Sequence, residues 1–103
     1  MKVFQCKEIR NCRRFYRYCY TLNAPIDAIL MDKLSLLGFI EVNKLSEYSP
    51  QFRDTFKISF DDQIEISGTV SDKQLYLTVS KQYPELKKVL EDTIIEWFTS
   101  KPT

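Results

Sequence analysis

The amino-acid sequence predicts a single α+β domain with two layers, in which helices cover mainly one face of a four-stranded antiparallel meander. Hydrophobic residues make up 44% of the 103 residues and charged residues 28%, which is typical of a globular chain. With two glycines and four prolines, most of the chain should form regular structure. Segments of helical period flank segments of two-residue alternation, so residues 1–103 form one domain with the order α-α-β-β-β-β-α.

The first predicted helix covers residues 7–22, after residues 2–6, which fit either a short strand or an extended lead-in. At 100° per residue, the apolar and aromatic side chains of this segment fall within an arc of about 160°, except Tyr18, which lies on the arginine face. The arginines lie on the facing side of the helix: Arg10, Arg13, Arg14 and Arg17. In a strand, Arg13, Phe15 and Arg17 would share one face, and this weaker separation of residue types favours the helix.

The second predicted helix begins at Pro25 and ends before Gly38. Proline is favoured at the first helical position, an aspartate such as Asp27 is favoured in the first turn, and glycine is a common helix stop. Its expected buried stripe consists of Ile26, Ile29, Leu30, Leu34 and Leu37.

Four strands should follow, of which residues 39–45 form an edge strand because their alternation is blurred. The other three strands are residues 55–60, 63–70 and 74–80, and each alternates strictly between apolar and polar positions. This alternation predicts one buried and one solvated sheet face, and the short turns between the strands predict consecutive antiparallel pairing. On the solvated face, we expect Lys57 and Glu65 to pair across strands.

The last predicted helix begins with Pro84 and Glu85, and five residues form its buried stripe: Leu86, Val89, Leu90, Ile94 and Trp97. Ile95 lies on the opposite side of this helix, with Phe98 about 60° away. We therefore treat Ile95 and Phe98 as a second contact point.

A four-stranded sheet is about 19 Å wide, and helices are about 10 Å across, so two helices nearly cover one face. The second and third helices have the more aliphatic stripes and should occupy those places. The first helix then packs on an edge, on another helix or on another molecule.

The stretch RRFYRYCY, residues 13–20, lies in the basic end of the chain, since residues 1–22 carry six basic groups against one acidic group. Arginine, tyrosine and phenylalanine are enriched at protein interfaces. The predicted partner-binding residues are Arg10, Arg13, Arg14, Phe15, Tyr16, Arg17, Tyr18 and Tyr20. The leading hypothesis is a non-enzymatic protein-interaction module, either an adaptor or regulator or a self-associating unit.

The alternative is a nucleic-acid-binding module that uses the same arginine face. It is weaker because most of the rings of the predicted helix point away from the arginines, and because the net charge of the chain is only +1.

Enzymatic chemistry has little support in the sequence. The chain contains no histidine, which excludes Ser–His and Cys–His nucleophilic pairs, and its two glycines form no phosphate-binding loop. The spacing of the three cysteines matches no zinc site, so we expect no metal and no cofactor. No apolar run of about 18 residues predicts a membrane span, and the first residues lack the apolar core of a secretory signal. We therefore expect an intracellular, cytoplasmic protein with no membrane partner.

Overall fold

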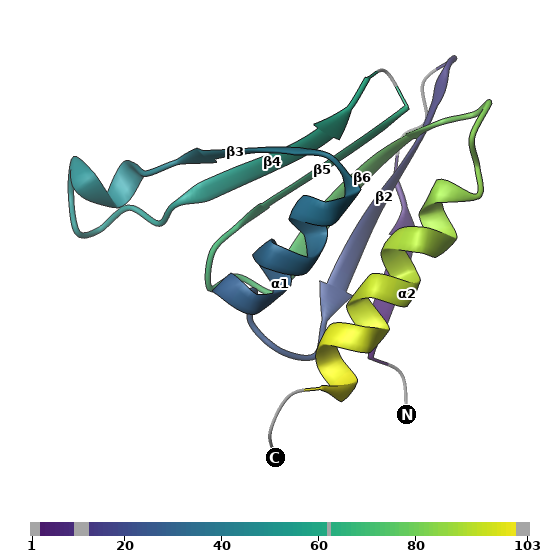
Figure 1. The fold of residues 1–103 in the computed structure, drawn as a ribbon. Coiled ribbons are helices and arrows are strands. Elements are labelled where there is room, and N and C mark those ends of the chain that lie inside the picture. Colours follow the sequence, from purple (N-terminus) through teal and green to yellow (C-terminus); the bar gives the residue numbers. More distant parts are fainter. Residues whose placement is uncertain (1–2, 10–12, 62, 101–103) are drawn as a thin grey trace.

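The computed structural model describes residues 3–9, 13–61 and 63–100, which form one antiparallel sheet with two helices on one face (Figure 1). Its strands are β1 (Phe4–Glu8), β2 (Phe15–Leu22), β3 (Phe39–Asn43), β4 (Thr55–Phe60), β5 (Ile64–Thr69) and β6 (Gln74–Ser80). The helices are α1 (Ala28–Leu34) and α2 (Leu86–Thr99), with short 3-10 helices η1 (Ser35–Leu37) and η2 (Leu45–Glu47). The order along these residues is β-β-α-β-β-β-β-α.

The predicted fold class is wrong in its first element, because most of the segment expected to be a helix forms β2, a strand that pairs antiparallel with β1. The sheet therefore has six strands rather than four, in the order β1-β2-β6-β5-β4-β3. Tyr16, Tyr18 and Tyr20 alternate along β2 and pair with residues of β6, from Val79 to Leu75. Aromatic and β-branched residues favour strands, and β2 is hydrogen-bonded along both edges, so pairing with the distant β6 overrides the helical pattern.

The meander of β3, β4, β5 and β6 agrees with the sequence analysis, as does the edge position of β3. The predicted pair of Lys57 and Glu65 is also confirmed, with 3.2 Å between Nζ and Oε1. Both side chains are about half exposed on the sheet face that the helices leave open, so this ion pair contributes little to stability.

Helix α1 begins later than predicted, after Asp27 rather than at Pro25. Asp27 has an extended backbone, and its Oδ1 accepts a hydrogen bond of 2.9 Å from the backbone N–H of Leu30, so it is the N-cap. Of the expected stripe, Ile26, Leu30 and Leu34 are buried, Leu37 is half-buried, and Ile29 is exposed.

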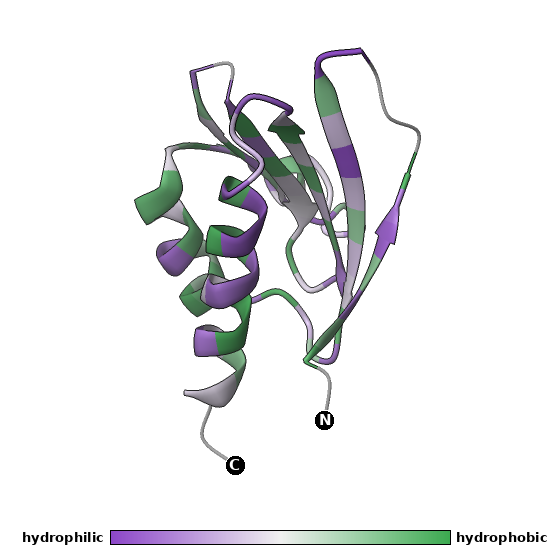
Figure 2. Ribbon diagram, turned by 90° about the vertical axis from the view of Figure 1, so that its right-hand side faces the viewer, coloured by the Kyte–Doolittle hydropathy of each residue, from purple (hydrophilic) through white to green (hydrophobic). Residues whose placement is uncertain are grey.

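The hydrophobic core lies between the two helices and the sheet. Figure 2 shows the sheet nearly edge-on, with both helices on the same side of it. Strands β2, β4, β5 and β6 contribute alternate residues to it, and α2 contributes Leu90, Ile94 and Trp97. Strand β1 starts and helix α2 ends at one end of the molecule, and β4 ends and β5 starts at the other end (Figure 1).

Candidate functional site

The predicted partner-binding residues lie on and before β2. Those on the strand alternate between the two faces of the sheet. Phe15 and Arg17 point to the open face of the sheet, because they alternate with the tyrosines that face the helices. Arg13 and Arg14 precede β2 and are exposed. Arg10 lies outside the described residues.

Tyr18 and Tyr20 of β2 contact helix α2 of the same chain. Tyr20 is 0% exposed, and its hydroxyl donates a hydrogen bond of 2.8 Å to Oε2 of Glu91. The same oxygen accepts a hydrogen bond of 2.6 Å from Nζ of Lys87, which also lies 4.9 Å from the centre of the Tyr18 ring. Tyr20 therefore holds α2 on the sheet and has no surface to offer a partner.

The buried hydroxyl of Tyr20 makes the free energy of unfolding depend on pH in the alkaline range. Burial, and then the hydrogen bond to Glu91, raises the pKa of Tyr20 above its ordinary value of 10.0. The unfolded chain ionises Tyr20 near pH 10 and the folded chain does not, so its contribution is intact below pH 10 and is lost as pH rises further. We expect the free energy of unfolding to fall by about 1.4 kcal/mol per pH unit from this residue. Urea unfolding at pH 9, 10 and 11 measures this, and equal slopes for wild type and Tyr20→Phe would contradict it.

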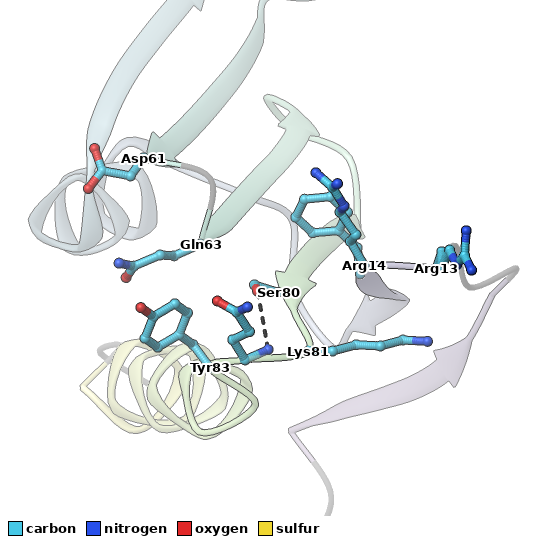
Figure 3. Close-up of a pocket in the computed structure, with 9 residues that line it drawn as sticks. Arg13, Arg14, Asp61, Gln63, Ser80, Lys81 and Tyr83 are labelled. Atoms are coloured by element: carbon cyan, nitrogen blue, oxygen red, sulfur yellow. Dashed lines mark hydrogen bonds between the residues drawn. The ribbon is translucent and has the colours of Figure 1, made fainter.

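A basic pocket of about 830 Å³ opens at the end of the sheet where β2 begins (Figure 3). Its lining consists of residues 13–15 before and at the start of β2, Asp61 and Gln63 at the turn between β4 and β5, and residues 80–83 at the end of β6. Arg13, Arg14 and Lys81 supply three positive charges, against one negative charge from Asp61.

Backbone hydrogen bonds join the three segments of the basic pocket. The N–H of Lys81 donates to the carbonyl oxygen of Arg14 at 3.0 Å, and the N–H of Ser80 donates to that of Gln63 at 2.7 Å. Oγ of Ser80 accepts a further bond of 3.2 Å from the N–H of Gln82, drawn dashed in Figure 3. The Lys81 side chain makes a cation–π contact with the ring of Tyr16, whose centre lies 5.2 Å from Nζ. The backbone of Arg14 and Lys81 is thus fixed by hydrogen bonds at the end of the sheet.

An apolar groove of about 550 Å³ lies beside the basic pocket, and Gln63 lines both. Its apolar lining residues are Leu36, Leu37, Phe39, Phe60, Ile64, Leu86 and Val89. Leu36 is 86% exposed and Phe39 is 83% exposed, while Phe60 and Val89 are about half as exposed. Large apolar side chains that gather at one hollow are typical of a binding surface, whereas scattered ones are ordinary.

Gly38 positions the two most exposed residues of the groove. A Cβ at Gly38 would lie 2.6 Å from the backbone carbonyl oxygen of Ser59, so only glycine lets the chain pack directly on β4 here. Leu36 and Phe39, on either side of Gly38, are thereby held at the groove.

The sequence pattern does not indicate this groove. The helical stripe predicts a buried Val89, although 40% of the residue is exposed, and the alternation around Phe39 predicts only an edge strand. One signal was available: Leu36 falls outside the stripe that fills the helix–sheet core, yet it is a leucine. The other predicted contact residues lie on α2: Ile95 is 41% exposed, and Phe98 packs against the core with its ring 6.4 Å from that of Trp97.

Within the described ranges, no three acidic or cysteine side chains are grouped so that they could hold a metal ion. Nor does this part of the chain contain a helix long and apolar enough to span a bilayer. Comparison with protein-family models, curated proteins and solved structures finds no match to this chain. The candidate site therefore consists of the apolar groove and the basic pocket at one end of the sheet.

Proposed function

We propose that this chain is a non-enzymatic protein-binding module whose contact surface is the apolar groove. The observation that carries this proposal is that Leu36 and Phe39, both more than four-fifths exposed, line the same hollow. Burying one such side chain against a partner contributes about 1.5–3 kcal/mol, so these two residues supply the central contacts that a small interface needs.

The position of the groove also supports this proposal. It lies next to β3, an edge strand whose exposed residues include Phe39 and Val42. Exposed apolar edge strands attract other chains unless they are protected by charge or proline, and β3 carries one charged residue, Glu41. The predicted use of Tyr20 as a contact is not part of this proposal, because Tyr20 is enclosed by α2.

Replacing Leu36 and Phe39 with serine should weaken partner binding at least about tenfold without unfolding the domain, because both side chains already face solvent. The probe is a displayed library of random 12-residue peptides, selected on the wild-type chain, with the enriched peptides then measured by fluorescence anisotropy. Ile29→Ser is the matched control, since Ile29 is an exposed apolar residue outside the groove, and Ile95→Ser tests the predicted second contact point.

Two results would overturn the proposal. One is a selection that enriches no peptide. The other is a set of enriched peptides that bind Leu36→Ser/Phe39→Ser as tightly as wild type while Ile95→Ser weakens them.

Nucleic-acid binding is the second candidate function, because Phe15 lines the basic pocket together with Arg13 and Arg14. It has less support than protein binding. Two rings line the pocket, but Tyr83 lies on the side of Asp61 and away from the arginines, and the carboxylate of Asp61 would repel phosphates.

A further inference from the structure

We infer that the partner of the apolar groove is an acidic peptide segment, with an apolar side chain in the groove and carboxylates in the basic pocket. This inference rests on the proposed function and specifies the chemistry of the partner. Gln63 lines both hollows, so they are neighbours at the end of the sheet and one extended segment can occupy both.

The charges of the basic pocket favour a carboxylate ligand. Lys33, Lys57 and Lys87 each have a carboxylate partner of the same chain within 3.2 Å. Among the residues that the structure describes, Arg14 and Lys81 form no such ion pair, and the pocket keeps a net positive charge.

The geometry of the cations also suits carboxylates. The planar guanidinium of an arginine binds a carboxylate through two parallel hydrogen bonds. In Figure 3 the side chains of Arg13, Arg14 and Lys81 extend from one side of the pocket, and Asp61 stands on the other side. A carboxylate bound near the arginines would therefore be attracted by their positive charges and would lie away from the negative charge of Asp61.

The two hollows differ in polarity, and this difference favours a peptide over a nucleic acid. The groove is lined almost wholly by apolar side chains, whereas the lining of the pocket is mainly charged and polar and includes the rings of Phe15 and Tyr83. A peptide can present an isoleucine, leucine or phenylalanine within a few residues of aspartates and glutamates. A polynucleotide has no aliphatic side chain to bury among the leucines of the groove.

The test is the same displayed 12-residue library, selected in parallel on wild type, on Arg14→Glu/Lys81→Glu and on Lys44→Glu/Lys73→Glu. Both variants change the net charge equally, but Lys44 and Lys73 lie outside the basic pocket and the groove. We expect wild type and the control to enrich peptides with an apolar residue close to aspartates and glutamates. The pocket variant should bind these peptides at least about tenfold more weakly, and raised salt should weaken wild-type binding. Leu36→Ser/Phe39→Ser should weaken them as well.

The remaining outcomes overturn the inference in distinguishable ways. Neutral enriched peptides that depend on Leu36 and Phe39 but not on Arg14 and Lys81 would leave the proposed function standing without an acidic partner. A dimer in light scattering that dissociates in Leu36→Ser/Phe39→Ser would assign the groove to a second copy of the chain. Failure to enrich any peptide, with retention of a 20-nucleotide poly(U) probe that Arg14→Glu/Lys81→Glu abolishes, would overturn both the inference and the proposed function.

Discussion

Replacing Trp97 with alanine should lower the free energy of unfolding by about 3–5 kcal/mol, the typical cost of emptying a buried aromatic site. Trp97 is 1% exposed and is among the largest fully buried side chains in the core between α2 and the sheet. A domain of this size has about 5–15 kcal/mol of total stability, so a large share would be lost. Urea unfolding followed by far-ultraviolet circular dichroism measures the change, since the variant lacks the only tryptophan of the chain.

Two variants serve as controls for this prediction. Trp97→Phe retains most of the apolar area but loses the indole N–H, so its cost should be intermediate. Phe98→Ala removes a half-buried neighbouring ring and should cost less than Trp97→Ala. An equal loss for Phe98→Ala and Trp97→Ala would contradict the central place of Trp97 in the core.

The second large effect is expected at Asp27, where Asp27→Ala should cost roughly 2–4 kcal/mol. One carboxylate oxygen, Oδ1, accepts a hydrogen bond from the N–H of Leu30 and another of 3.0 Å from Nε1 of Trp97. Alanine removes the N-cap of α1, which costs about 1 kcal/mol, and leaves the buried indole N–H without this acceptor, which costs about 1–3 kcal/mol more.

A series at Asp27 separates these two contributions. Asp27→Asn keeps an acceptor oxygen in the same place and should stay within about 1 kcal/mol of wild type. Asp27→Ser can still cap the helix, but its shorter side chain does not reach Trp97, so it should fall between the asparagine and alanine variants. If the serine and asparagine variants unfold at the same urea concentration, the bond to the indole contributes nothing.

The parts of the fold that the sequence predicted are those with a single clear period. The apolar residues of β4, β5 and β6 recur strictly every second position, a spacing that does not fit a helix. Helix α2 begins within one residue or two of the start that Pro84, Glu85 and its apolar stripe predict. In such segments, the local pattern and the tertiary environment favour the same structure.

The segment of β2 was misread because its residues fit both periods. Tyr16, Cys19 and Tyr20 share a face at helical spacing, but Tyr16, Tyr18 and Tyr20 also share a face in a strand. What decides between them is pairing with β6, more than 50 residues later in the chain. No window on the first 22 residues contains that information.

The candidate site was predictable only in part for a related reason. The exposed arginines 13 and 14 were predicted as contact residues, but the apolar groove depends on how η1, β4 and α2 meet in space. Val89 shows the difficulty, since its helical position predicts burial and the end of the sheet beside it leaves it half open.

The start of β1 and the end of α2 lie at the end of the molecule opposite the place where β4 ends and β5 starts. Any tether, tag or neighbouring domain joined at either position would sit on the far side from both hollows. A sensor surface that holds the chain by one terminus would therefore leave the groove facing the solution. A host protein that carried this domain as an insert would do the same, since both of its connections would leave from that far side.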